Sequence, residues 1–248
     1  MDNTGSKPED TLSSEAIFAN IARIKAGIAE AAAEAGRDPE EITLVAASKM
    51  NDAPRIRMAF SGGVSVFGEN RVQEMLEKQT LGAYEGAHLH FIGHLQKNKV
   101  KQVVGLAELI HSVDSAELMD CIAREAGRHG LIQEILLEVN IGNEASKSGF
   151  SPDRIDAAME QAACLEGIRV RGLMAIPPIC VSEAENLPYF TRMQQLFIDI
   201  REKKYDNSSM DFLSMGMSRD YRAAISCGSN MIRIGTGLFG PRQYGIKP

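Results

Sequence analysis

The sequence of 248 residues contains no tryptophan and four cysteines, none of which forms a CxxC pair with another. Cysteines scattered in this way do not indicate a disulfide framework, and they favour a reduced, cytoplasmic protein. No apolar run approaches the roughly 20 residues that a membrane span needs. The net charge of −6 argues against general affinity for nucleic acid or anionic membranes. Residues 1–11 are polar and lack the apolar core of a signal peptide, so we expect a disordered lead-in.

Sequence patterns for a metal site and for a dinucleotide site are also missing. His88, His90 and His94 lie close together, but no cysteine or paired acid with zinc-ligand spacing accompanies them, and we expect no bound metal. An open, doubly wound sheet that binds a dinucleotide would carry a GxGxxG turn after its first strand. The first β-rich run here ends in SKM without any glycine, so this alternative fold is disfavoured.

Short β-rich runs alternate with helix-like stretches after an amphipathic helix that we predict over Leu12–Ala35. The eight candidate strands are Thr43–Ser48, Val64–Gly68, Leu89–Gly93, Leu109–Val113, Glu134–Ile141, Arg169–Ile176, Phe212–Met217 and Met231–Gly235. The helix-like stretches include Asn70–Gln79, Ser115–Gly130, Pro152–Leu165 and Ser182–Lys203. Alternation of this kind predicts right-handed βαβ units, and eight units in this length favour a closed (β/α)8 barrel. We expect one domain, spanning residues 12–248.

Polar residues follow every candidate strand except the sixth, and in such barrels the functional site lies at the carboxyl ends of the strands. Lys49 follows the first strand, after Leu-Val-Ala-Ala. Partial desolvation there would lower the pKa of its ammonium group and make the amine a nucleophile toward an aldehyde. The alternative is a lysine that extends to the barrel mouth without any chemical role.

The seventh and eighth strands end in small residues, where barrels often bind phosphate. Backbone N–H groups near Gly235 and Thr236 and the hydroxyl of Ser218 can reach phosphate oxygens. We also predict that Ser218 caps a helix over Tyr221–Ile225. The alternative is that the glycines serve only tight turns.

Arg233 lies inside the eighth apolar run, and a buried arginine requires partners for its donors. If Lys49 held an aldehyde and the eighth strand held a phosphate, a ring would lie between them. Arg233 would then be able to donate to a ring nitrogen. A structural ion pair with Glu138 or Asp114 is the alternative.

Lysine, phosphate site and ring-facing arginine together are typical of a pyridoxal 5′-phosphate (PLP) site, and the sequence resembles the pyridoxal phosphate homeostasis proteins (the YggS/PROSC family). The matching stretches, from Leu44 to Gly240, are LVAASKM, FGENRVQE, HFIGHLQKNK, HSVDS, EVNIGNEASKSGF, RGLMAIP, LSMGMSRDYRAAI and RIGTGLFG. The resemblance implies a single (β/α)8 barrel similar to the N-terminal domain of alanine racemase. Met50 and Leu89 depart from the residues that many family members carry.

The resemblance also implies the roles of single residues. Lys49 matches the lysine that holds PLP as an aldimine, and Arg233 matches the arginine facing the pyridine nitrogen. Lys147 matches a second lysine linked to cofactor handling. The remaining matches to cofactor-binding positions are Asn70 near the ring and Met217, Ser218, Gly235 and Thr236 around the phosphate.

The implied function is intracellular PLP homeostasis, in which the protein holds PLP and makes it available to other proteins, including apo forms of PLP-dependent enzymes. An arginine opposite the ring nitrogen keeps that nitrogen unprotonated and weakens the electron sink that catalysis needs. The sequence extends eight residues beyond Gly240, and we expect no second domain like that of alanine racemases. We therefore expect a monomer without catalytic residues, and an amino-acid racemase is the alternative. Surfaces on Leu12–Ala35 or Ser182–Asn207 are candidates for partner contact.

Overall fold

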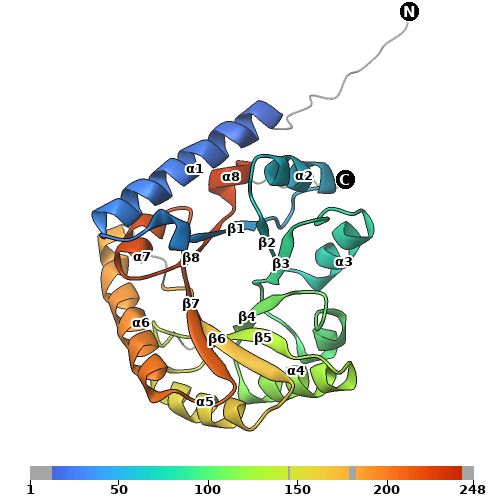
Figure 1. Ribbon diagram of the computed structural model, residues 1–248, viewed down its shortest axis with the longest axis vertical. Coiled ribbons are helices and arrows are strands. Elements are labelled where there is room, and N and C mark those ends of the chain that lie inside the picture. Colours follow the sequence, from blue (N-terminus) through green and yellow to red (C-terminus); the bar gives the residue numbers. More distant parts are fainter. Residues whose placement is uncertain (1–12, 145, 179–182, 242–248) are drawn as a thin grey trace, which may run out of the picture.

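Eight parallel strands close into a barrel in the computed structural model, which describes residues 13–144, 146–178 and 183–241 (Figure 1). Each strand pairs with its neighbours in chain order, and β1 also pairs with β8. The strands are β1 (Thr43–Ala47), β2 (Val66–Glu69), β3 (His88–Phe91), β4 (Leu109–Val113), β5 (Gln133–Val139), β6 (Ile168–Ala175), β7 (Ser208–Met217) and β8 (Met231–Ile234). The predicted closed (β/α)8 barrel is confirmed, and the open doubly wound sheet is excluded.

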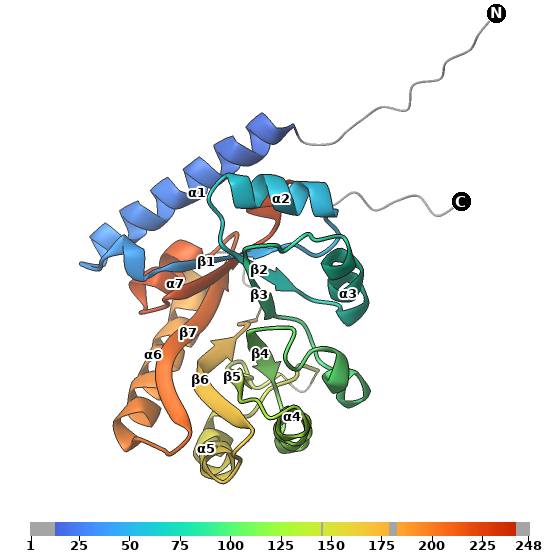
Figure 2. The ribbon, with the colours of Figure 1, turned by 45° about the vertical axis from the view of Figure 1, so that its right-hand side comes forward.

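Helices cover the outside of the barrel, as Figure 2 shows from a second direction. The α-helices are α1 (Ser14–Glu34), α2 (Ala53–Ser61), α3 (Val72–Thr80), α4 (Ala116–Arg128), α5 (Ile155–Ala163), α6 (Glu183–Lys203), α7 (Tyr221–Ser226) and α8 (Thr236–Phe239). Short 3-10 helices are η1 (Pro39–Glu41), η2 (Lys97–Gln102) and η3 (Pro152–Arg154). The predicted strands agree with these bounds to within two residues, except that β7 begins four residues before its predicted start. Between β3 and β4 the crossover uses η2 in place of an α-helix.

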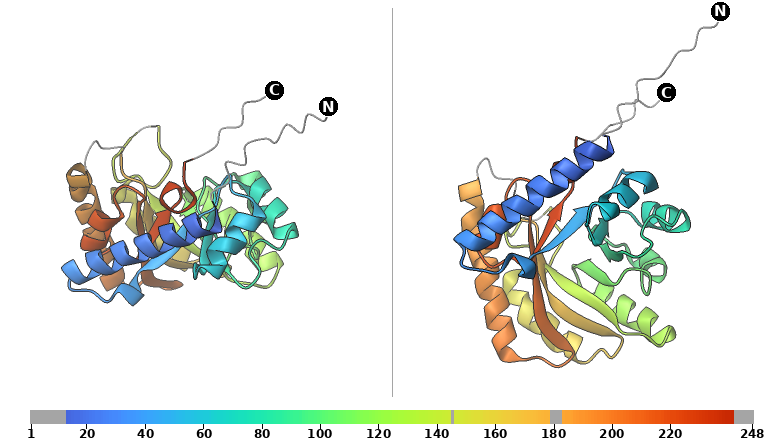
Figure 3. Two further views of the ribbon diagram at one scale, coloured as in Figure 1. Left: turned by 90° about the horizontal axis from the view of Figure 1, so that it is seen from above. Right: turned by 45° about the horizontal axis from the view of Figure 1, so that its top comes forward.

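Helix α1 lies along the outside of the barrel, beside α2, α7 and α8 (Figure 3). Ser13 caps its start by accepting a hydrogen bond from Ala16 N–H at 3.3 Å. The predicted apolar face is confirmed, because the isoleucines at positions 17, 21, 24 and 28 are all buried. Gly27 allows α1 to approach α7 closely, since a Cβ there would lie 2.2 Å from the hydroxyl of Tyr221.

Two side chains of α1 also hold the last helix of the barrel. Asn20 Nδ2 donates to the carbonyl of Leu238 at 3.1 Å, and Arg23 Nη2 donates to the carbonyl of Gly237 at 2.9 Å. Carbonyls at the end of a short helix lack partners within the helix, so these two donors satisfy them. Helix α1 therefore stabilises α8, the segment that follows β8.

The apolar core has two parts, one inside the barrel and one between the barrel and its helices. The smaller, inner part consists of Val45, Ala47, Val66, Ile92, Leu109, Leu136, Met174 and Met231. Alternate residues of a strand point to the same face, so Val45 and Ala47 share the inward face of β1, and Arg233 continues the inward series of Met231 in β8. Within the described ranges, no helix is both long and apolar enough to cross a membrane.

Candidate functional site

The loops after β7 and β8 meet at the carboxyl end of the barrel. Ser218 Oγ accepts a hydrogen bond from Gly237 N–H at 3.3 Å, which joins the two loops. Gly235 lies beside β1, where an added Cβ would come within 3.4 Å of the Ala47 carbonyl oxygen. Thr236 is exposed next to it, and Met217, which pairs with Arg233 in the sheet, is 38% exposed at the end of β7. The structure thus brings together the residues predicted around a phosphate.

The prediction that Ser218 caps the following helix is wrong. Asp220 occupies the N-cap position of α7, and Ser218, two residues earlier, contacts Gly237 instead. Asp220 is buried, and its Oδ1 accepts from Met217 N–H at 2.6 Å while its Oδ2 accepts from Asn186 Nδ2 at 2.8 Å. The Asp220 carboxylate therefore shapes this turn and leaves the Ser218 hydroxyl beside the neighbouring loop.

The chain turns at Lys49 directly after β1, and a buried ion pair holds the residue before it. Glu69, fully buried at the end of β2, accepts from Ser48 Oγ at 2.6 Å, Lys78 Nζ at 2.7 Å and Tyr84 Oη at 2.8 Å. Lys78 Nζ also donates to the Ser48 carbonyl at 2.9 Å. A buried carboxylate needs a cation and further donors. All three donors reach Oε1 of Glu69, whereas its Oε2 has no partner among the described residues. The bonds to Ser48 fix the position of that residue and, with it, the point from which Lys49 extends.

Helix α3 also holds the residue after Lys49. Met50 has a φ of +62°, a left-handed conformation that residues other than glycine rarely adopt. Its N–H donates to Glu74 Oε2 at 2.7 Å. Burial tends to raise the pKa of Glu74, but the bond from Met50 N–H and the Lys78 ammonium lower it overall, so Glu74 remains an anionic acceptor. The backbone is thus fixed on both sides of Lys49.

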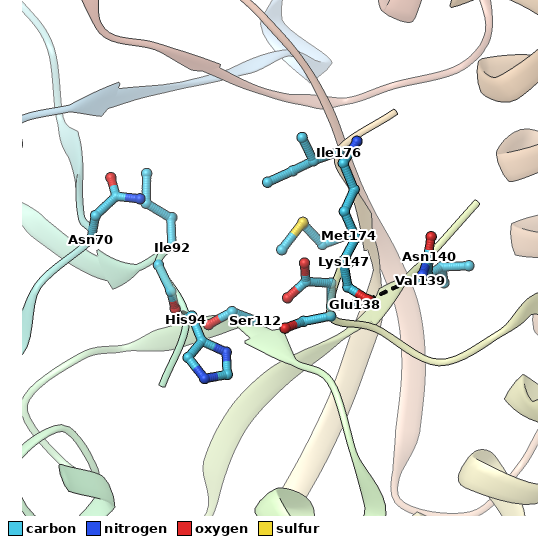
Figure 4. Close-up of a pocket in the computed structure, with 12 residues that line it drawn as sticks. Asn70, Ile92, His94, Ser112, Glu138, Val139, Asn140, Lys147, Met174 and Ile176 are labelled. Carbon is cyan, nitrogen blue, oxygen red and sulfur yellow. Dashed lines mark hydrogen bonds between the residues drawn. The ribbon is translucent and has the colours of Figure 1, made fainter. Parts of the chain in front are cut away.

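A cavity of about 240 Å³ lies among the ends of β2 to β6 (Figure 4). It is lined by Asn70, Ile92, Gly93, His94, Ser112, Glu138, Val139, Asn140, Lys147, Ser148, Met174 and Ile176. Two predicted site residues, Asn70 and Lys147, therefore face the same cavity, although they follow different strands. The amide oxygen of Asn70 is buried and has no hydrogen-bond partner within the described part of the chain.

The loop after β5 presents Lys147 along one wall of this cavity (Figure 4). Lys147 Nζ donates to the Pro177 carbonyl at 3.2 Å and forms an ion pair with Glu144. The Asn140 amide closes the loop by donating to the carbonyls of Glu144 at 2.8 Å and Lys147 at 3.1 Å. The loop's own hydrogen bonds therefore define where Lys147 lies.

Glu138 is a titratable group of the cavity, although its sequence context suggested only an ion pair with Arg233. Burial, together with the nearby Asp114 carboxylate, raises its pKa to about 7, although Arg233 and His94 act in the opposite direction. Its carboxylate points into the cavity in Figure 4. Near neutral pH, Glu138 therefore exists in both protonated and ionised forms, which neither its position in β5 nor the residues around it in sequence would reveal.

Arg233 lies inside the barrel, and neutral oxygens hold it. Its Nη1 donates to the Ser214 carbonyl at 2.9 Å and to Ser214 Oγ at 2.6 Å, while its Nη2 donates to the Ala175 carbonyl at 3.0 Å. The alternative of an ion pair with Glu138 or Asp114 is wrong, because neither carboxylate forms one with Arg233. Burial lowers the pKa of Arg233 to about 10, against the effect of Glu138 and Asp220, so the guanidinium stays protonated at neutral pH.

Comparisons with known proteins identify the family of this chain. The family model for the N-terminal domain of alanine racemase matches residues 13–243. A pyridoxal phosphate homeostasis protein of Pseudomonas aeruginosa is 42% identical over 231 residues, which cover 92% of this chain and 97% of that protein. One of Aquifex aeolicus is 39% identical over 224 residues, which cover 90% and 97%. The structure of PipY from Synechococcus elongatus with PLP bound matches with a TM-score of 0.79 and 31% identity, and covers 90% of this chain and 100% of PipY.

The closed parallel barrel and the match of residues 13–243 to the family model define a barrel of the alanine racemase N-terminal class. Within that class, the chain belongs to the pyridoxal phosphate homeostasis protein family. The resemblance found in the stretches from Leu44 to Gly240 is thereby confirmed.

Removing the cation from the buried ion pair should destabilise the fold. Lys78→Met leaves the Glu69 carboxylate buried without its partner, which typically costs about 3–5 kcal/mol. The double variant Glu69→Gln/Lys78→Met should recover part of this loss, because an amide needs no cation. Urea unfolding measures both, with exposed Lys101→Met as a control expected to change stability by less than about 0.5 kcal/mol. If Lys78→Met matched the control, the ion pair would not hold this strand end.

The raised pKa of Glu138 predicts a pH-dependent difference between the protein and its Glu138→Gln variant. The folded state favours the protonated carboxyl, so its contribution to stability is complete below about pH 4.5 and is lost as pH rises through about 7. Glutamine mimics the protonated form and does not titrate. From pH 5 to pH 8 the variant should gain stability relative to the protein, by up to about 3 kcal/mol in urea unfolding. The control is the exposed Glu117→Gln variant, whose difference in stability from the unaltered protein should stay constant between pH 5 and pH 8. If the difference for Glu138→Gln were constant as well, the raised pKa of Glu138 would be contradicted.

Proposed function

We propose that this chain binds PLP covalently at Lys49 and holds it for delivery to other proteins. The observation that carries the proposal is that three features lie at the carboxyl end of the barrel, on the neighbouring strands β7, β8 and β1. These are the fixed turn at Lys49 after β1, the buried Arg233 in β8, and the Ser218–Gly237 contact between the loops after β7 and β8. The related PipY structure, solved with PLP bound, supports the choice of ligand.

The residues present fit the chemical groups of this cofactor. Bound PLP would supply an aldehyde that condenses with a primary amine and releases water, and Lys49 would provide that amine. An added Cβ at Gly235 would make only ordinary contacts, 3.4 Å or more from β1, so packing within the protein does not require glycine there. A phosphate that approaches the backbone N–H groups does require it. Ser218 adds a hydroxyl to the same place.

Arg233 favours a holding role over catalysis. It can only donate hydrogen bonds, and it stays protonated at neutral pH. A ring nitrogen that accepts from Arg233 remains unprotonated, which weakens electron withdrawal from a substrate carbon. We therefore assign no catalytic residue in this barrel. Asn70 and Lys147 line the adjoining cavity and form the second group of residues that we assign to the cofactor.

Delivery to another protein requires a surface near the barrel mouth. Met50, Ile176 and Met217, at the ends of β1, β6 and β7, are 47%, 37% and 38% exposed. Methionine side chains adapt to differently shaped partners. We therefore favour this rim over α1 or the Ser182–Asn207 segment as the contact for apo forms of PLP-dependent enzymes. Of that segment, Ser182 lies outside the described residues. We retain the expectation of a monomer in the cytoplasm.

Borohydride reduction of the PLP-treated protein tests the proposal directly. We expect peptide mass mapping to find a phosphopyridoxyl group on the peptide that contains Lys49. Lys49→Ala should lose this label, whereas the exposed Lys101→Ala variant should keep it. A label scattered over surface lysines, or none, would refute PLP binding at this site and would leave the loops after β7 and β8 to another phosphorylated compound.

A racemase is the second candidate function, because the matching family model describes the N-terminal domain of alanine racemase. A racemase exchanges the Cα proton of its amino acid with solvent. With PLP present in deuterium oxide, we expect no deuterium at Cα of alanine beyond the rate that free PLP gives. Mass spectrometry of the recovered amino acid measures this rate. Incorporation that depends on Lys49 and exceeds the free-cofactor rate would show that the protein is an enzyme.

A further inference from the structure

A continuous line of buried polar side chains runs from Arg233 through the inside of the barrel. Arg233 Nη1 lies 2.6 Å from Ser214 Oγ in β7, which lies 3.1 Å from His111 Nδ1 in β4. His111 Nε2 lies 3.0 Å from His90 Nδ1 in β3. All four residues are buried, between 0% and 7% exposed. Side chains from four strands are thus linked in one hydrogen-bonded chain inside the barrel.

The direction of this chain follows from the chemistry of its first member. A guanidinium has no acceptor, so Ser214 Oγ must accept from Arg233. The hydroxyl of Ser214 has one proton to donate, and its only other recorded partner within the described residues is Nδ1 of His111. Because a buried hydroxyl that leaves its proton unpaired loses free energy, Ser214 donates to His111.

The same reasoning extends to both histidines. With Nδ1 accepting from Ser214, neutral His111 carries its proton on Nε2 and donates it to Nδ1 of His90. His90 must then carry its own proton on Nε2. Burial lowers the pKa of His90 to about 3, and burial together with His90 and Arg233 lowers that of His111 well below its usual value, so both rings are neutral. The neighbouring His88 and His94 instead contact Glu108 and Asp114.

We propose that Ser214, His111 and His90 are positioning residues that hold Arg233 in one orientation through a hydrogen-bond chain of fixed direction. Arg233 Nη1 donates to the carbonyl and to the hydroxyl of Ser214, and Nη2 donates to the Ala175 carbonyl. Both terminal nitrogens are thus held, which fixes the plane of the guanidinium. The part of this inference that concerns a cofactor ring facing Arg233 rests on the proposed function.

Neutral acceptors suit this task better than a carboxylate does. An acidic partner would hold the guanidinium equally well but would cancel its charge in the low-dielectric interior. Ser214 and the histidines fix its orientation without adding a negative charge. Arg233 therefore keeps its positive charge close to the loops after β7 and β8, where it favours an anionic ligand.

Histidine tautomers test the chain in the full-length protein before any cofactor is added. Ring ¹⁵N–¹H correlation NMR at neutral pH should show both His111 and His90 protonated on Nε2. Ser214→Ala removes the link to Arg233 and should shift the Nδ1 resonance of His111. The matched control is Ser229→Ala, which removes another buried serine hydroxyl that bonds the carbonyls of Leu213 and Met215. It should lower stability and leave both rings unchanged.

Two NMR outcomes would overturn the inference. One is a proton on Nδ1 of His111 in the unaltered protein, since Ser214 could not then donate to that ring. The other is an Nδ1 resonance of His111 that Ser214→Ala leaves in place. A change of equal size in Ser229→Ala would assign the effect to general loosening of the fold and would likewise contradict a role of this particular chain.

Cofactor binding tests the consequence for Arg233. Ser214→Ala should weaken PLP binding about tenfold in an absorbance titration, since hydrogen bonds to a charged group are worth at least that factor. It should also shift the absorption band of the bound cofactor, and Ser214→Thr, which keeps the hydroxyl, should restore both. If Lys49 is labelled by reduction but Ser214→Ala binds PLP as tightly as the unaltered protein does, the positioning role is refuted and the proposed function is supported. If Lys49 is not labelled but both histidines are protonated on Nε2, the hydrogen-bond chain is supported and the proposed function is refuted.

Discussion

The pairing of β1 with β8 is the interaction on which the rest of the structure depends, because it turns a row of strands into a closed barrel. Its register places Val45 beside Arg233, which come from opposite ends of the chain. The same register puts Lys49 and Gly235 on neighbouring strand ends. In an open sheet these residues would lie at two separate edges, and no site could form between them.

Two of the buried charges, on Glu69 and Arg233, are stabilised in opposite ways. Glu69 has a cation beside it, Lys78, and two hydroxyl donors, so its surroundings are locally neutral and serve to fix a strand end. Arg233 has only neutral oxygens as direct partners, and its compensating carboxylates act from farther away. The first arrangement builds a rigid frame, whereas the second keeps an electric field at the mouth of the barrel.

Much of this architecture is predictable from the sequence, because strand and helix periods are local properties of the chain. The eight strands and the inward position of Arg233 follow from that periodicity, whereas the inward position of Lys49 and the cofactor roles of both residues stay predictions. The predicted helix cap by Ser218 was wrong because Asp220 takes the N-cap position of α7 and binds the backbone of the same turn. The link from Ser214 to His111 was not predictable, since which inward residues meet depends on the stagger between strands across the barrel. A raised pKa at Glu138 likewise depends on burial that only the fold creates.

The contacts of α1 with the end of the described chain affect the order of folding. Asn20 and Arg23 bind carbonyls of α8, and the isoleucine face of α1 packs near α7 and α8. During synthesis α1 and β1 emerge long before their partners α7, β8 and α8. The apolar face of α1 and the open edge of β1 therefore stay uncovered until these later elements have formed, and contacts between such distant positions form slowly. Closing the barrel is thus a late event in folding.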